Sequence, residues 1–139
     1  MKNYKELIQN ATKEDYLNNK INLHIHTKYS DGKGEFNDIV KQAKNKYKLF
    51  AITDHNTIQG HIDNPDSEAI YGVEFDVWYK YIFLHLLAYG IDINNEEMKK
   101  FYAKNKKETE MDILRFFAKR NIKELNFIIE QVKNFQCFF

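Results

Sequence analysis

The feature that most constrains the fold is a short segment, residues 49–53, with the sequence Leu-Phe-Ala-Ile-Thr. A continuous apolar run of this length is typical of a strand that is buried on both faces of a parallel sheet. The preceding residues, 35–47, carry apolar side chains at helical spacing with lysines between them: Phe36, Ile39, Val40, Ala43 and Tyr47. Residues 21–27 form an extended segment before this helix. The order strand, helix, strand predicts a right-handed βαβ unit with two parallel strands.

The first of these strands alternates between apolar and polar side chains. His24 and His26 are expected on one face of the strand. The opposite face is expected to carry the apolar side chains of Ile21, Leu23 and Ile25. Two histidines at positions i and i+2 can converge on one metal ion. Two surface histidines on an exposed strand are the alternative that this motif alone leaves open. The turn at residues 27–32 then brings Asp31 back beside the end of the strand.

The second strand also ends in polar residues, because Asp54 and His55 follow Ile52 and Thr53 directly. The C-terminal ends of parallel strands are where α/β folds build their sites. We therefore expect His55 to face the same region as the first two histidines, although a histidine in an ordinary loop is the alternative. Residues 57–69 are less regular and contain a turn, and His61 within them is expected to be a solvent or turn residue rather than a ligand.

Two further strands are predicted at residues 70–75 and 81–88, and each carries one polar residue among apolar ones. Glu74 is costly to bury without a cationic partner, which could be a metal ion or a lysine. His85 interrupts the fourth strand, where a histidine satisfied within the core is the ordinary interpretation. We favour a ligand at this position because three other histidines and two acids end on neighbouring strands.

Length and charge limit the remaining possibilities. The 139 residues fit one domain, with a lead-in helix in 1–19, a β/α region in 20–93 and a helical region in 94–139. A net charge of +1, from 21 basic and 20 acidic residues, gives no global attraction to nucleic acid or membrane. The polar N-terminus does not resemble a secretory signal, and the apolar run around residues 81–91 is too short to span a bilayer. We expect a soluble, cytoplasmic protein with no membrane partner.

Five segments in succession resemble the motifs of the PHP (polymerase and histidinol phosphatase) superfamily. In order, they are residues 23–27 (LHIHT), 30–32 (SDG), 52–56 (ITDHN), 72–75 (GVEF) and 85–92 (HLLAYGID). Any one of them is a weak signal, but five in the right order and spacing make a specific match over roughly residues 20–120. The resemblance implies a distorted (β/α)7 barrel with a metal cluster, usually of three ions, at the C-terminal mouth of the strands.

The resemblance also implies the ligands and the chemistry. Six residues would be divided among three ions: His24, His26 and Glu74 for the first; Glu74 and His85 for the second; and Asp31 and His55 for the third. Histidine and carboxylate together accept zinc, manganese or iron. Asp54 and His55 are the candidate catalytic residues, and Asp54 would orient its neighbours rather than hold an ion.

The chain departs from the family pattern in its second half. Family members are longer and take further ligands from that half, whereas no histidine follows His85 here. A complete (β/α)8 barrel needs about 250 residues. We therefore expect a truncated or minimal member with about four mainly parallel strands, fewer than three ions, and an open sheet edge through which a homodimer could form.

Two functions from different classes follow from this pattern. The first is a metal-dependent phosphoesterase that hydrolyses a phosphorylated small molecule or nucleotide, either a phosphomonoester or a phosphodiester. The second is a catalytically inactive PHP remnant that acts as a metal-binding or protein-interaction module.

Overall fold

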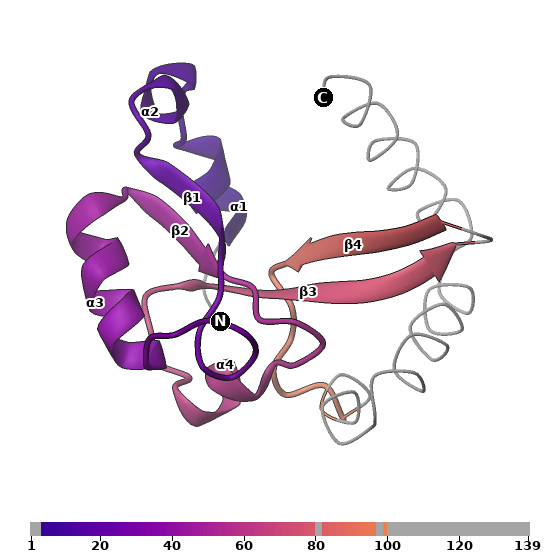
Figure 1. Cartoon of the computed structure of the whole chain (residues 1–139). Coiled ribbons are helices and arrows are strands. Elements are labelled where there is room, and N and C mark those ends of the chain that lie inside the picture. Colours follow the sequence, from indigo (N-terminus) through magenta and orange to yellow (C-terminus); the bar gives the residue numbers. More distant parts are fainter. Residues whose placement is uncertain (1–3, 80–81, 97–98, 100–139) are drawn as a thin grey trace.

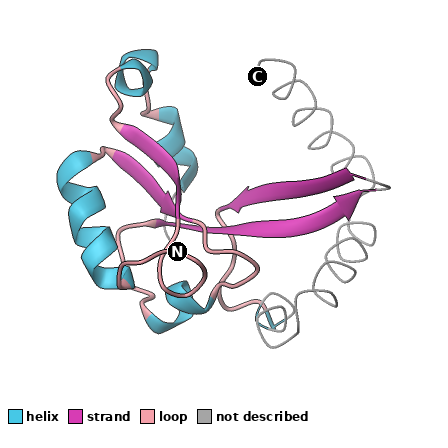
Figure 2. Cartoon of the chain, in the orientation of Figure 1, coloured by secondary structure: helices cyan, strands magenta, loops and turns pink. Residues whose placement is uncertain are grey.

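A computed structural model of the chain describes residues 4–79, 82–96 and 99. Its helices are α1 (Tyr4–Gln9), α2 (Lys13–Leu17), α3 (Phe36–Lys46) and α4 (Gln59–Asp63), and its strands are β1 (Ile21–Ile25), β2 (Leu49–Ile52), β3 (Ile70–Tyr79) and β4 (Ile82–Tyr89). The strands form one curled sheet in the order β1-β2-β3-β4 (Figures 1 and 2). The first two pairings are parallel and the third is antiparallel. This confirms the predicted α/β class with mostly parallel strands.

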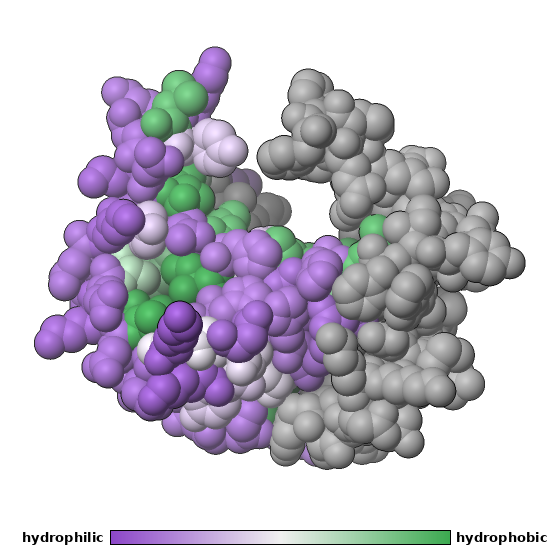
Figure 3. All heavy atoms as spheres, in the orientation of Figure 1, coloured by the Kyte–Doolittle hydropathy of each residue, from purple (hydrophilic) through white to green (hydrophobic). Residues whose placement is uncertain are grey.

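Strand β2 is buried on both faces, as its continuous apolar sequence predicts. Phe50 and Ile52 pack with Phe36 and Ala43 of α3 on one side of the sheet. On the other side of the sheet, Leu49 and Ala51 of β2 pack with Ile70 and with the start of β1. In Figure 3 the visible described surface is mostly hydrophilic, with apolar residues in a few separate patches. The buried apolar residues of α3, β1 and β2 therefore gather around β2.

Strand β1 contains an irregularity that the sequence pattern does not reveal. Asn22 of β1 pairs with Phe50 of β2, and Ile25 pairs with Ile52. Between these two pairs, β1 advances by three residues and β2 by only two. One extra residue in β1 is a bulge, and it reverses the alternation of faces beyond it. The expectation that Ile25 shares a face with Ile21 and Leu23 is thus wrong.

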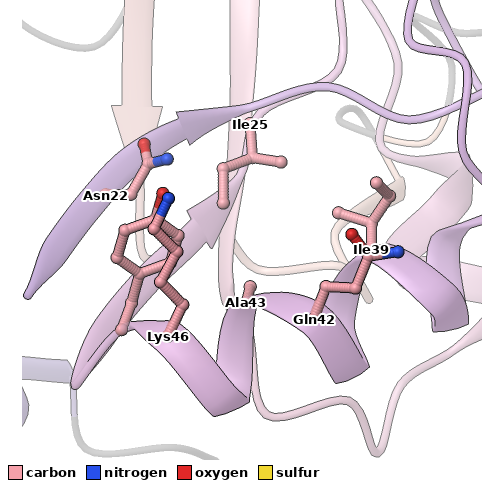
Figure 4. Close-up of a pocket in the computed structure, with 7 residues that line it drawn as sticks. Asn22, Ile25, Ile39, Gln42, Ala43 and Lys46 are labelled. Carbon is pink, nitrogen blue, oxygen red and sulfur yellow. The ribbon is translucent and has the colours of Figure 1, made fainter.

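The bulge places Ile25 on the α3 side of the sheet. Ile25 packs with the cluster beneath α3, whereas Ile21 and Leu23 pack with the cluster on the opposite side. Asn22 and Ile25 line the same groove of about 200 Å³ against α3, to which Lys46 also contributes (Figure 4). The histidines that flank Ile25 are therefore directed away from this groove.

The β3–β4 hairpin extends beyond the ends of β1 and β2 (Figure 1). One of its faces is apolar, because Val73, Phe75 and Leu86 pack together with Ile58 at the start of α4. The intervening positions of β3 are Glu74 and Asp76, which must lie on the other face. The hairpin is thus apolar on one side and carries carboxylates on the other.

His61 lies in α4 and is only 2% exposed, so the expectation of a solvent or turn residue is wrong. Its Nε2 atom lies 3.0 Å from the carbonyl oxygen of Ile52 and 3.1 Å from the amide nitrogen of Gly72. The ring thus links β2 to β3, and Phe36 packs edge-on against it. A buried histidine of this kind supports the sheet rather than the candidate site.

The predicted lead-in helix is two short helices, because Thr12 begins a new one. Its hydroxyl accepts a hydrogen bond from the Asp15 amide, and the Asp15 carboxylate accepts one from the Thr12 amide. This reciprocal cap satisfies amide groups at the start of α2 and ends the continuity with α1. The predicted helices of residues 94–139 lie almost wholly outside the described residues. No helix among the described residues is both long and apolar enough to cross a membrane.

Candidate metal centre

Four histidines gather around one buried carboxylate, that of Glu74 on β3. Its side chain is 4% exposed, and its Oε2 atom lies 2.6 Å from His24 Nε2 and 2.8 Å from His26 Nε2. Its Oε1 atom lies 2.8 Å from His85 Nδ1, on the neighbouring strand β4. His55 pairs with Glu74 through a parallel bridge just beyond β2, and its Nε2 atom is 3.7 Å from Oε2. The structure therefore brings together residues from all four strands or their ends.

Asp31 reaches the same cluster from the loop after β1. Its Oδ1 atom lies 2.7 Å from His26 Nδ1, and its Oδ2 atom lies 3.6 Å from His55 Nε2. The hydrogen bond with His26, and then the charge of His55, lower the pKa of Asp31 below its ordinary value of 3.8. The side chain is 69% exposed, so Asp31 forms the solvent-facing edge of the centre.

Asp54 holds the loop that carries Asp31. Its two oxygens accept hydrogen bonds of 2.7 Å from the amide of Thr27, the hydroxyl of Thr27 and the hydroxyl of Ser30. Thr27 is completely buried, so these bonds fix the loop to the end of β2. This geometry fits the predicted orienting role of Asp54, while its part in catalysis stays a prediction.

The loop also depends on Gly32. A Cβ atom at this position would collide with the backbone of His26 and Thr27, which cannot move without disturbing the end of β1. Gly32 also donates a hydrogen bond from its amide to the carbonyl of Thr27, at 2.9 Å. Only glycine fits this close approach, and the approach is what returns Asp31 to His26.

Asp76 is not among the predicted site residues, and the structure places it inside the cluster. Its side chain is 3% exposed, and its Oδ1 atom lies 3.1 Å from both His55 Nδ1 and His85 Nδ1. Asn56 donates a hydrogen bond to its Oδ2 atom at 2.9 Å. A signal existed, because Asp76 follows Glu74 by two residues and shares its face of a strand. The predicted strand ended at Phe75 and so left this position out.

Tyr89, at the end of β4, ties the two edges of the curled sheet together. Its hydroxyl donates a hydrogen bond of 2.9 Å to the carbonyl of Leu23 on β1. Burial, followed by the charge of Glu74, raises the pKa of Tyr89 to about 12. The hydroxyl therefore stays protonated and keeps its role as a donor at neutral pH.

Three groups in this cluster have the composition and spacing of a metal site. Within each group the ligand atoms lie within 4.8 Å of one another: His24, His26 and Glu74; His26, Asp31 and His55; and His55, Asp76 and His85. Mixed imidazole and carboxylate donors suit zinc, manganese and iron, so the residues present fit such an ion. The first group is the predicted one. The second adds His26 to the predicted Asp31 and His55, and the third keeps the predicted His85 but has His55 and Asp76 in place of Glu74.

A family model described as PHP domain matches residues 22–129. An uncharacterised protein of Methanocaldococcus jannaschii is 44% identical over a stretch that covers 40% of this chain and 39% of that protein.

Two solved structures resemble the described fold. One, from Bifidobacterium adolescentis, has metal-dependent phosphoesterase activity ascribed to it; it is 28% identical, with a TM-score of 0.51 over 60% of this chain and 32% of that one. The other is an amidohydrolase from Chromobacterium violaceum with bound sulfate and no metal; it is 26% identical, with a TM-score of 0.52 over 57% of this chain and 30% of that one. The chain thus spans about a third of each matched structure.

Proposed function

Because the chain belongs to the PHP domain family, we propose that it is a metal-dependent hydrolase that cleaves phosphoric esters. The observation that carries the proposal is the convergence of four imidazoles on Glu74, whose side chain is almost completely buried. Burying a carboxylate costs free energy unless cations or hydrogen bonds compensate for it. A cluster of this composition at the C-terminal ends of parallel strands is where an α/β fold places a site.

One ion would be held by the groups around β1, with His24, His26 and Glu74 as its ligands. Asp31 lies 2.7 Å from His26 Nδ1 and would orient that ring, because a neutral imidazole offers only one nitrogen lone pair to an ion. A divalent ion held there lowers the pKa of water and offsets the negative charge on phosphate oxygens. Zinc, manganese and iron all suit these donors.

The chain's own residues orient this centre. Asp54 holds the backbone and hydroxyl of Thr27, which keeps His26 and Asp31 in reach of each other. Carboxylate groups that fix the neighbours of a metal ligand in this way contribute to metal affinity. Asp31 and His24 are both substantially exposed, so a substrate phosphate would approach from their side.

The substrate class proposed is a phosphomonoester or a nucleotide phosphodiester. The matched structure from Bifidobacterium adolescentis supports the phosphoesterase reaction, and the family supports the metal requirement. The amidohydrolase from Chromobacterium violaceum shows that a related fold also carries a different hydrolytic assignment. Ester and amide substrates should therefore be tested side by side.

A second candidate function is metal binding without turnover. The observation that favours it is solvent exposure, because the side chains of His24 and His85 are 49% and 50% exposed. An open centre is poorly shielded from water, which weakens every electrostatic contribution to catalysis. Such a chain would act as a metal-binding or protein-interaction module, and an open sheet edge would be one route to a homodimer.

The first experiment measures bound metal per chain by elemental analysis, on untagged protein purified without added metal. Hydrolysis of a model phosphomonoester, a model phosphodiester and a model amide is then measured, as release of the alcohol or amine, with Mn²⁺, Zn²⁺ or Fe²⁺ restored. Under the first function, His24→Ala and Glu74→Ala abolish release. Asp66 is an exposed turn residue and provides the matched control, because Asp66→Asn should leave hydrolysis unchanged.

Each outcome separates the two functions. Metal-restored hydrolysis that depends on Glu74 supports the hydrolase and excludes the inactive module. Bound metal without any turnover supports the module instead. Hydrolysis that survives both substitutions would show that the activity arises elsewhere, and the proposal would then be wrong.

A further inference from the structure

Asp76 and His85 form a directly opposed pair on the β3–β4 hairpin. The antiparallel register places Asp76 opposite His85 and Glu74 opposite Leu87. Directly opposed side chains on one face of a hairpin lie about 5 Å apart at their Cβ atoms. The register therefore brings this carboxylate and this imidazole together, without help from a loop.

The two carboxylates of β3 share the imidazole of His85. Its Nδ1 atom lies 2.8 Å from Glu74 Oε1 and 3.1 Å from Asp76 Oδ1. A neutral imidazole carries a single N–H, so Nδ1 can donate one strong hydrogen bond and not two. Ligand atoms bound to one transition metal ion at about 2.1 Å are separated by about 3–3.5 Å, and the 3.1 Å between His85 Nδ1 and Asp76 Oδ1 falls in this range.

Burial makes the pair of carboxylates expensive. The side chains of Glu74 and Asp76 are 4% and 3% exposed, and every ion pair described for them is with a histidine. Two carboxylates at positions i and i+2 of one strand face also repel each other when both are ionised. A divalent cation among them would neutralise this charge.

We infer that Asp76 is a metal ligand, which binds a divalent cation together with His55 and His85 on the hairpin side of the centre. This inference rests on the proposed metal-dependent function and adds a ligand to it. The position is distinct from that of His24 and His26, which face the other oxygen of Glu74. Asn56 holds Asp76 in place for this role. Its side chain donates a hydrogen bond to Asp76 Oδ2 and accepts one from the Asp76 amide, which leaves Asp76 Oδ1 directed at the two imidazoles.

The test compares Asp76→Asn with the wild-type chain and with Asp66→Asn as a matched control on an exposed turn. Asparagine keeps the shape and one acceptor oxygen, so a hydrogen bond that merely orients His55 would survive, whereas the charge needed by a ligand is lost. Calorimetric titration with Mn²⁺ and elemental analysis measure the ions bound. We expect Asp76→Asn to lose one ion per chain, or to bind it at least about 10-fold more weakly.

Thermal unfolding provides a readout that a purely structural role would not produce. In EDTA, Asp76→Asn should unfold at the same temperature as the wild type or higher, because the repulsion between the two buried carboxylates is removed. With Mn²⁺ it should gain less stability than the wild type, because binding to the folded state alone raises stability. A lower unfolding temperature in EDTA with an unchanged gain from Mn²⁺ would show a structural role and overturn the inference.

His85→Gln provides a second route if Asp76→Asn folds poorly, because His85 is half exposed. It should lose the same ion, and the double variant should lose no more than either single one. Metal content that is unchanged in all of these variants overturns the inference about Asp76. The proposed hydrolase function is judged separately, from hydrolysis measured on the same samples. Asp76-dependent binding without turnover would refute only the proposed function, and a wild-type chain that binds no ion would refute both.

Discussion

The loop after β1 and the β3–β4 hairpin bring ligands to the same centre by different means. The hairpin positions Glu74, Asp76 and His85 through strand pairing, and both carboxylates are almost completely buried. The loop positions Asp31 through side-chain hydrogen bonds to Asp54 and a close backbone approach at Gly32, and Asp31 is 69% exposed. Ligands on strands are held by many backbone bonds, whereas the loop depends on a few contacts that single substitutions can remove.

The largest expected effect compares one carboxylate from each region. Glu74→Gln should weaken Mn²⁺ binding by more than about 100-fold, because Glu74 contacts imidazoles on both of its oxygens in a buried position. Asp31→Asn should weaken it only about 10-fold, because Asp31 lies at the exposed edge. Calorimetric titration measures both. Equal losses in the two variants would show that the buried and exposed carboxylates contribute alike, and the contrast would then be wrong.

The next effect tests how far the loop depends on Asp54. Asp54→Ala leaves the buried amide and hydroxyl of Thr27 without their acceptors, which should lower the free energy of unfolding by at least about 1–3 kcal/mol. Urea unfolding in EDTA measures this change without any contribution from metal. Thr27→Val is the matched control, because it removes one of these bonds and keeps the volume. If Asp54→Ala costs no more than Thr27→Val, the loop is held by other contacts.

An effect of similar size is expected from the backbone of the loop itself. Gly32→Ala should destabilise the chain by about 1–3 kcal/mol and displace Asp31, because the new Cβ would collide with the backbone of His26 and Thr27. Gly34→Ala should cost less, since its Cβ would meet only the side chain of Ile39, which can move. Urea unfolding of the two variants gives the comparison. The reverse order would contradict the requirement for glycine at position 32.

The smallest effect concerns pH and the exposed edge of the centre. The pKa of Asp31 is lower in the folded chain than its ordinary 3.8, so the ionised form stabilises the fold. This stabilisation is fully present above pH 3.8 and is lost as the pH falls through the folded-state pKa. In metal-free protein, the loss of stability on acidification should be slightly smaller for Asp31→Asn than for the wild type. A larger loss in the variant would reverse the sign and exclude the hydrogen bond with His26 as the cause.

Much of the fold could be predicted from the sequence because local patterns carried it. The apolar run at residues 49–53 predicted a strand buried on both faces, and the helical stripe before it predicted α3 within one residue at each end. Six polar residues of the cluster also stood out, because histidines and acids that interrupt apolar strands or follow them directly are unusual. The assignment of those six residues as metal ligands stays a prediction.

The tertiary structure alone decided the points that depend on contacts between distant residues. The bulge in β1 is visible only in its register with β2, and it directs Ile25 toward α3. The antiparallel pairing of β3 with β4 set Asp76 opposite His85, which no reading of either strand alone could show. His61 was buried because its ring meets backbone atoms of β2 and β3. Local sequence determines which residues are polar or apolar and how they alternate, whereas pairing register and packing determine which of them meet.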